Sequence, residues 1–376
     1  MTKDPAAANS AAPAASSALP PVDNAAAALV RAHLLPKVLL HEHLDGGLRV
    51  ATLLALLQQR GLRPPADTVP GLAAWFQANA HAGSLEKYLE GFALTVAAMA
   101  SPEALERVAF EAAEDALDDG VVLAEFRIAP LLFEAHGLSG EAVIEALLAG
   151  LKRSRLPSGL IVCGMRHLPP EQTERAARLA LKYQGQGVVA FDLAGAELGH
   201  PPSEHATALR LVRDAGLSIT LHAAEADGPV RVLEAAELGA ARIGHGVHLI
   251  EALRDPAREW MLDAVRQRGL HLEVCPTSNV HTGAAASLAT HPITQLWQAG
   301  VSLSYHTDNR LMSCVDMSQE AAALIAQTSL SEVDLLAMAA EAARHSFLPA
   351  SERDVALEII AAFSTGLLPR VPVVLA

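Results

Sequence analysis

Short apolar runs of strand length recur eight times along the chain, and each is followed by a longer stretch with helical periodicity. The expected strands are 37–41 (KVLLH), 121–129 (VVLAEFRIA), 160–166 (LIVCGMR), 188–194 (VVAFDLA), 218–223 (SITLHA), 241–245 (ARIGH), 270–275 (LHLEVC) and 301–306 (VSLSYH). Most are apolar on both faces, which is typical of a parallel sheet covered by helices. Eight strand–helix units predict an α/β protein with a (β/α)8 TIM barrel. A doubly wound sheet with a second domain is the main alternative.

The segments between and after the strands read as helices. Ser101 is a typical N-cap for the stretch that ends at Gly120. The long insert after the first strand, about residues 48–120, is expected to contain several helices that cover the barrel mouth. Its aromatic residues are Trp75, Phe76, Tyr88 and Phe92. The part from residue 318 onward is helical by period and is expected to pack outside the barrel as extra C-terminal helices.

The N-terminal segment differs in composition from the rest. Residues 1–35 are rich in Ala, Ser and Pro and are expected to form a flexible tail that ends in a short helix before Pro36. Prolines 13, 20 and 21 interrupt its apolar stretches, so it does not read as a secretion signal. Residues 36–376 are expected to form one barrel domain.

Composition and charge limit the partners. The net charge of −14 disfavours nucleic acid and anionic membranes and is compatible with a small neutral ligand. No apolar run reaches the length of a membrane span. The three cysteines, Cys163, Cys275 and Cys314, are too few and too scattered for a disulfide framework, so a reducing, cytoplasmic location is expected. The oligomeric state is left open.

Polar residues follow several of the expected strands at their carboxyl ends. They are His41 and His43 on the first strand, His222 and Glu225 on the fifth, His245 on the sixth, and Asp308 with Asn309 after the eighth. Barrel enzymes build their sites at this end of the strands. We therefore expect these side chains to meet at one rim.

His41 and His43 are two residues apart in a strand, so both side chains face the same side. Two neutral imidazoles suit a zinc-type ion, and His222 and Asp308 complete a mixed nitrogen and oxygen site with a position for water. Such an ion turns water into a nucleophile near neutral pH, which predicts hydrolysis. Taken singly, each residue is also compatible with a packed histidine or a turn aspartate. His306 shares the inward direction of Asp308 and stays ambiguous.

The remaining candidates are set aside. His33, His81, His136, His291 and His345 lie in helical or loop sequence and are interpreted as structural. Binuclear hydrolases of this architecture use a carboxylated lysine at the end of the fourth strand. The nearest lysine here, Lys182, precedes that strand. One metal ion per subunit is therefore expected.

Six motifs carry a resemblance to a known family. In chain order they are PKVLLHEHLDGGLR, FDLAGAELGHP, LHAAEADGP, RIGHGVHLI, CPTSNVHTGA and TDNRLMS. Their order and spacing from about residue 36 to 349 resemble the adenosine deaminase family of the amidohydrolase superfamily. The resemblance implies a zinc-dependent hydrolase that converts adenosine and 2′-deoxyadenosine to inosine compounds and ammonia in purine nucleotide metabolism.

The resemblance also assigns roles. Zinc would be held by His41, His43, His222 and Asp308. Glu225 would shuttle a proton at purine N1, and His245 would orient and stabilise the attacking hydroxide. The purine nucleoside would contact His43, Asp45, Gly195 and Asn309, with Gly195 donating to N3, Asp45 accepting from the 5′-hydroxyl, and the Asn309 amide facing N7.

Two positions depart from the family pattern. Ala224 stands where the family usually has Gly, and His306 stands where it usually has Asn.

The substrate is the least constrained inference. Relatives that act on free adenine typically carry Glu in place of Asp45, which favours adenosine here. Adenine or aminodeoxyfutalosine deamination, a non-catalytic nucleoside-binding barrel and an amide or lactam hydrolase are the alternatives.

Overall fold

The computed structural model describes residues 24–80 and 85–366. Its eight strands are β1 (Lys37–His43), β2 (Val121–Ile128), β3 (Ser158–Met165), β4 (Val188–Ala194), β5 (Ser218–Ala223), β6 (Arg242–His245), β7 (His271–Val274) and β8 (Leu303–Tyr305). The strands follow one another around the sheet in sequence order, and neighbours pair in parallel. The predicted (β/α)8 barrel is confirmed, and the doubly wound alternative is wrong.

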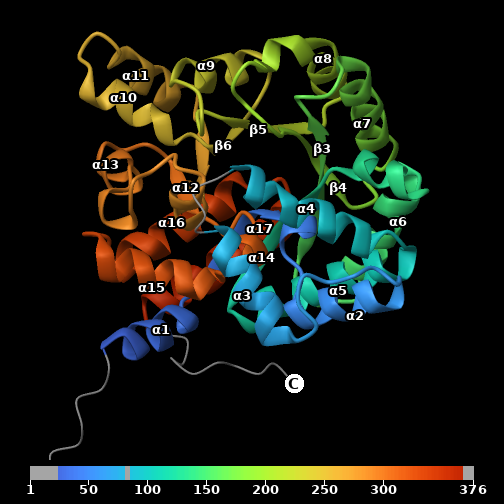
Figure 1. Cartoon of the computed structure of the whole chain (residues 1–376). Coiled ribbons are helices and arrows are strands. Elements are labelled where there is room, and N and C mark those ends of the chain that lie inside the picture. The colour runs from blue at the N-terminus through green and yellow to red at the C-terminus, as the bar shows by residue number, and fades with distance from the viewer. Residues whose placement is uncertain (1–23, 81–84, 367–376) are drawn as a thin grey trace, which may run out of the picture.

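Helices surround the barrel, and in Figure 1 the colour runs around the ring in chain order. They are α1 (Asn24–Leu34), α2 (Val50–Gln59), α3 (Val69–Ala80), α4 (Leu85–Met99), α5 (Pro102–Asp118), α6 (Gly140–Leu151), α7 (Pro170–Lys182), α8 (Ala206–Asp214), α9 (Val230–Glu237), α10 (Ile250–Arg254), α11 (Trp260–Gln267), α12 (Pro276–His281), α13 (Ile293–Gln298), α14 (Arg310–Ser313), α15 (Met317–Gln327), α16 (Glu332–His345) and α17 (Ala350–Ser364). Short 3-10 turns include η1 (Leu44–Gly46) and η3 (Pro202–His205).

The helical insert after β1 consists of α2 to α5. Ser101 caps α5, since its side chain accepts a hydrogen bond from the Ala104 N–H, and Gly120 follows the helix with a left-handed φ of 80°. Phe92 of α4 lines the cavity at the barrel mouth, as expected for part of a cover. The side chain of Tyr88 lies outside the described residues.

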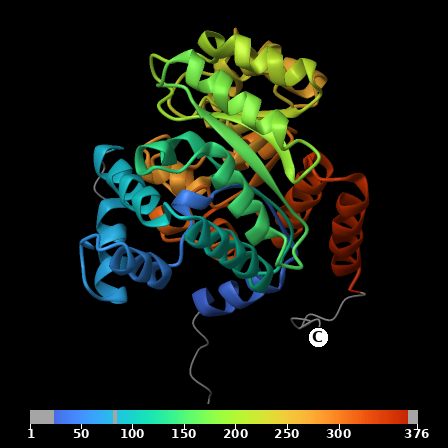
Figure 2. The same cartoon turned by 90° about the vertical axis from the view of Figure 1, so that its right-hand side faces the viewer.

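The C-terminal helices pack on the outside of the barrel, as predicted. Ala339 and Ala342 of α16 and Ile360 of α17 form one apolar cluster with Val38 and Leu40 of β1. Leu123 of β2 and Leu348, which lies between the two helices, belong to the same cluster, and α16 also contacts β8. In Figure 2 the red helix beside the C-terminus lies on this outer layer.

The expected N-terminal tail comprises residues 1–35. Of these, residues 1–23 lie outside the described residues. From Asn24 the chain forms α1, which packs against α15, and Ala32 and Leu35 are buried. Lys37 at the start of β1 donates from Nζ to the carbonyl oxygens of Ala32 and Leu35, at 2.9 and 2.8 Å. In the part of the chain that the structure describes, no helix has both the length and the apolar character needed to cross a membrane.

The barrel closes between β8 and β1 through two backbone hydrogen bonds. The Asp308 N–H donates to the His41 carbonyl at 2.9 Å, and the His43 N–H donates to the Asp308 carbonyl at 2.8 Å. This closure is short, and it joins the two segments that carry the predicted histidine pair and aspartate. The rim of the barrel is therefore fixed at the place where the predicted site lies.

Candidate active site

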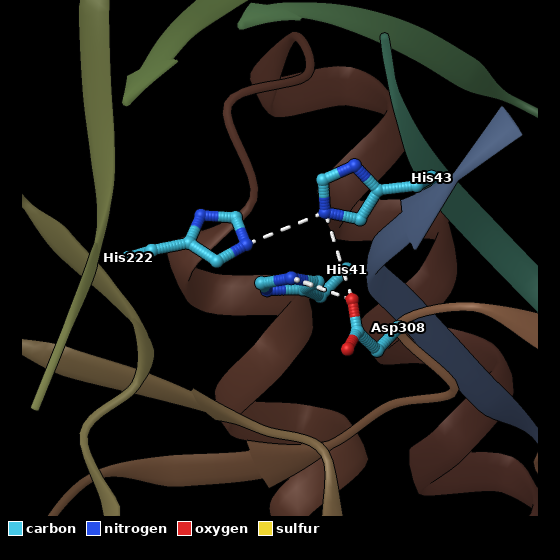
Figure 3. A group of neighbouring side chains, drawn as sticks. All are labelled: His41, His43, His222 and Asp308. Atoms are coloured by element: carbon cyan, nitrogen blue, oxygen red, sulfur yellow. Dashed lines mark hydrogen bonds and ion pairs between the residues drawn. The ribbon is translucent and has the colours of Figure 1, made fainter. Parts of the chain in front are cut away.

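Three histidines and one aspartate, from β1, β5 and the segment after β8, meet at the carboxyl ends of the barrel (Figure 3). One potential ligand atom from each of His41, His43, His222 and Asp308 lies within 4.8 Å of the others. Nε2 of His43 is 3.3 Å from Nε2 of His222 and 3.6 Å from Oδ1 of Asp308. The four side chains thus surround one point, as a tetrahedral metal site requires.

Buried carboxylates orient two of these imidazoles. His41 donates from Nδ1 to Glu273 at 2.8 Å, and His222 donates from Nδ1 to Asp192 at 3.0 Å. Because the proton is then on Nδ1, the Nε2 lone pair of each ring faces the common point. Arg127 bonds both carboxylates, at 2.8 Å to Asp192 and 2.6 Å to Glu273, so both stay ionised in the barrel interior.

The environment of the four side chains fits a cation. Nε2 of His41 is buried without a hydrogen-bond partner, and it lies 3.4 Å from Oδ1 of Asp308. Burial lowers the pKa of His43 well below its usual value, so the ring is neutral and its lone pair is available. Although burial by itself raises the pKa of Asp308, neighbouring His41 and His245 lower it well below its ordinary value. Neutral imidazoles and one carboxylate around a single point carry a net negative charge, which a bound cation would balance.

Glu225 and His245 lie beside this point. Oε2 of Glu225 is 3.5 Å from Nε2 of His245, and Oε1 accepts a hydrogen bond from Oγ1 of Thr282 at 3.0 Å. The Asn279 amide donates to Nδ1 of His245 at 3.0 Å. The proton of His245 is therefore on Nε2, which faces the cavity as a donor.

A cavity of about 590 Å³ opens over the four side chains. Its wall includes Asp45, Gly195, Glu225 and Asn309. Oδ1 of Asp45 and Oδ1 of Asn309 are buried without a hydrogen-bond partner. Burial raises the pKa of Asp45 to about 7. The residues predicted to contact the substrate, His43, Asp45, Gly195 and Asn309, all line this cavity.

The family follows from comparison with known proteins. The model of the adenosine deaminase family matches residues 36–363. The curated adenosine deaminase of Mycobacterium tuberculosis is 42% identical over 345 residues, which cover 88% of this chain and 94% of that protein. The chain belongs to the adenosine deaminase family.

Solved structures agree with this membership. An N6-mAMP deaminase from arabidopsis superposes with a TM-score of 0.76 at 26% identity, over 88% of this chain and 99% of that one. An adenine deaminase from Arthrobacter aurescens gives a TM-score of 0.79 at 22% identity, over 88% of this chain and 99% of that one, and shares the fold. The resemblance stated from the six motifs is confirmed, and the chain is a metal-dependent deaminase.

The two departures from the usual adenosine deaminase pattern leave the site intact. Ala224 has a φ of 56°, and its side chain belongs to the buried apolar core, apart from the residues that line the cavity. His306 is buried, accepts a hydrogen bond at Nδ1 from the Leu40 N–H at 3.2 Å and contacts Ser304 through Nε2 at 2.7 Å. His306 is therefore a packed residue directly after β8, between β8 and β1.

Several residues around the deaminase site were missed from the sequence. They are Asp192, Glu197, Glu273, Ser278, Asn279 and Thr282. Asp192 and Glu273 had a usable signal, because each is a charged residue inside an otherwise apolar strand. Ser278, which donates to Oδ2 of Asp308 at 2.6 Å, had no such signal, since its position depends on how α12 crosses the rim.

A second group of potential ligands lies away from the deaminase site. Single ligand atoms of His271, Glu341 and His345 also lie within 4.8 Å of one another. Both ring nitrogens of His271 are already bonded, to Ser302 at 2.9 Å and to Ser304 at 2.7 Å. The His271 and His345 rings stack at 4.5 Å and 12°, so their in-plane lone pairs do not converge. The structural interpretation of His345 agrees with this arrangement.

Proposed function

We propose that the chain catalyses the zinc-dependent hydrolytic deamination of adenosine and 2′-deoxyadenosine, which releases ammonia and leaves the inosine compound. The convergence of His41, His43, His222 and Asp308 beside Glu225 carries this proposal. Adenosine deamination is also the activity in the name of the curated relatives that are 42% identical over most of the chain.

The metal would be held by His41, His43, His222 and Asp308. When bound, zinc lowers the pKa of a water molecule that it contacts and so supplies a nucleophile near neutral pH. The protein contributes fixed ligands, since Glu273, Asp192 and Ser278 hold three of the four in place.

Glu225 would supply the proton that makes attack possible. Addition of oxygen at C6 removes the aromaticity of the pyrimidine ring, and the negative charge that develops on N1 must be neutralised in the same step. A carboxylic acid at the position of Glu225 protonates N1. His245, which carries its proton on Nε2, would orient the attacking oxygen by donating toward it.

The rest of the nucleoside would be recognised along the cavity wall. We assign Gly195 to purine N3, the Asn309 amide to N7, and Asp45 with His43 to the ribose side. Asp45 lines the cavity, and a carboxyl oxygen is a suitable acceptor for a 5′-hydroxyl. A φ of 92° at Gly195 requires glycine there, and a Cβ would approach Nδ1 of His167 to 2.7 Å.

The lining favours a nucleoside over a 5′-nucleotide. Among the described residues that line the cavity there is no Lys or Arg, whereas Asp45, Glu197, Glu225 and Asp308 are acidic. A 5′-phosphate next to Asp45 would lack the cationic partners that phosphate recognition usually employs. The pocket therefore differs in chemistry from one that prefers a nucleoside monophosphate.

We also infer that the protein is cytoplasmic and that its partner is a small molecule, not nucleic acid or a membrane. The cysteines are free, with Cys163 and Cys275 buried, which is compatible with a reducing compartment. The net charge of −14 disfavours nucleic acid.

Steady-state rates with adenosine, 2′-deoxyadenosine, adenine, aminodeoxyfutalosine and AMP test the substrate. We expect kcat/KM to be highest for the two nucleosides, with metal analysis showing one zinc per chain. A large preference for adenine or aminodeoxyfutalosine would reassign the substrate, and turnover of none of them with zinc bound would reject the deaminase role.

The role of Glu225 is tested by Glu225→Gln. The amide cannot deliver the proton to N1, so we expect kcat to fall by about 10²-fold or more while the zinc content is unchanged. Turnover near the wild-type rate with metal bound would show that another group protonates the ring.

A further inference from the structure

The loop that carries Glu225 leaves β5 through an unusual backbone conformation. Ala224, the first residue after the strand, has a φ of 56°, which L-residues seldom adopt. The loop continues to residue 229 and enters α9. A turn of this kind leaves consecutive N–H groups pointing to one side, and they need an acceptor.

The carboxylate of Glu197 is that acceptor. Its Oε1 accepts from the Ala224 N–H at 2.5 Å. Its Oε2 accepts from the N–H groups of Glu225 at 3.0 Å, Ala226 at 2.7 Å and Asp227 at 3.3 Å. Four consecutive amides thus converge on one carboxylate, and the Glu197 side chain is 7% exposed.

Glu197 holds the backbone of Glu225 while other groups hold its carboxyl group. The carboxyl group contacts Thr282 at 3.0 Å and His245 at 3.5 Å. Only a fixed backbone places that carboxyl group at one spot beside the metal ligands. Because Glu197 follows β4 and Glu225 follows β5, the contact also ties two neighbouring rim loops together.

The proposed metal ligand on the same strand, His222, has hydrogen bonds that do not come from Glu197. Arg166 donates from Nη2 to the carbonyl oxygens of His222 and Leu193, and the His222 ring is bonded to Asp192. Loss of the Glu197 contacts would therefore free the Glu225 loop without removing the supports of the metal ligand.

We propose that Glu197 is a positioning residue for the reaction, which acts by fixing the backbone of residues 224–227 so that Glu225 faces N1 of the substrate. This inference rests on the proposed role of Glu225 as the acid. Glu197 would thus act through the backbone of Glu225, because both of its carboxylate oxygens already accept from residues 224–227.

The test is Glu197→Gln, compared with Glu204→Gln as a matched control. Glu204 is exposed on η3 of the same β4–α8 connection. In the Gln variant an amide NH2 replaces one acceptor oxygen and faces N–H donors. We expect kcat for adenosine to fall by about 10- to 100-fold, because a small displacement of a catalytic group has an effect of this size. KM, the inhibition constant of inosine and the zinc content should stay within about 3-fold of wild type, and the control should be unchanged.

Hydrogen–deuterium exchange gives a readout that does not depend on catalysis. The amides of residues 224–227 should exchange faster in Glu197→Gln than in the wild type and in the control, while β5 itself stays protected. If the wild type does not deaminate adenosine, the proposed function fails and this exchange result alone decides the inference. An unchanged kcat, unchanged exchange at 224–227, or parallel loss of zinc and inosine binding would each overturn the positioning role.

Discussion

Ala224, His245 and Asp308 share a left-handed backbone conformation, with φ of 56°, 65° and 59°. Each stands directly at the end of a strand or just beyond it, at the rim where the site is built. Strain of this kind persists only where the surroundings fix the backbone, as Glu197 does for Ala224 and the β1 pairing does for Asp308. At the residue scale, the site is therefore made of backbone turns that aim side chains into the mouth.

The strain at Ala224 predicts that a larger residue destabilises the fold more than glycine does. We expect Ala224→Gly to change the free energy of unfolding by less than about 1 kcal/mol, because relief of the left-handed strain is offset by lost burial and greater chain entropy. Ala224→Val should destabilise by about 2–4 kcal/mol, since a β-branched residue at this φ adds strain and overpacks the core. Urea unfolding of both zinc-loaded variants is the measurement. Equal stability of the two variants would show that the turn is not strained.

At the element scale, the contact between β8 and β1 positions three of the four proposed metal ligands, His41, His43 and Asp308. Besides the two backbone bonds around Asp308, the ring of His306 accepts the Leu40 N–H, where a strand would ordinarily offer a carbonyl. Burial lowers the pKa of His306 well below its usual value, so the ring stays neutral and Nδ1 remains an acceptor. A side chain thus completes the barrel next to His41.

His306→Leu should weaken this closure. The Leu40 N–H would be buried without a partner, which costs about 1–3 kcal/mol, and the hold on zinc should weaken with it. His306→Asn keeps an acceptor close to the strand and should retain more of the stability. Thermal unfolding and zinc release to a competing chelator would distinguish the two variants. Stronger zinc binding in His306→Leu than in wild type would contradict the role of the ring.

At the scale of the whole molecule, the barrel interior below the site is charged. Arg127 and Arg242 bond Glu273 at 2.6 Å each, and Arg242 also bonds Glu125 at 2.6 Å, all in fully buried positions. The network reaches the metal ligands through Glu273 and His41. A cation bound at the top of this network would give His41 and Asp308 a shared partner.

Zinc should therefore stabilise the whole fold. At free zinc 1,000-fold above the dissociation constant, binding to the folded state contributes about 4 kcal/mol, and chelation should lower the Tm by several degrees. Differential scanning calorimetry of metal-stripped and zinc-reconstituted protein checks this expectation, with magnesium as the control ion. A Tm that does not respond to zinc would show that the four side chains do not bind it tightly.

The sequence by itself determined the barrel and the donor set. Eight apolar strand-length runs, separated by segments with helical periodicity, identify the barrel. Both signals are local, because each reflects which side chains of one segment are buried. His41, His43, His222 and Asp308 were predictable because each polar residue ends an apolar strand, and the strand ends of a barrel meet at one rim. The motif order added the family and the proposed roles of Glu225 and His245.

Only the tertiary structure decided how those groups are held. Asp192 and Glu273 were visible as charges in apolar strands, but their pairing with His222 and His41 depends on the barrel register. Glu197 accepts hydrogen bonds from four backbone N–H groups, and the His306 ring accepts one from the Leu40 N–H. These bonds join segments that are 27 or more positions apart. Such contacts carry no local pattern, because their direction is set by the packing of neighbouring strands rather than by the sequence around either residue.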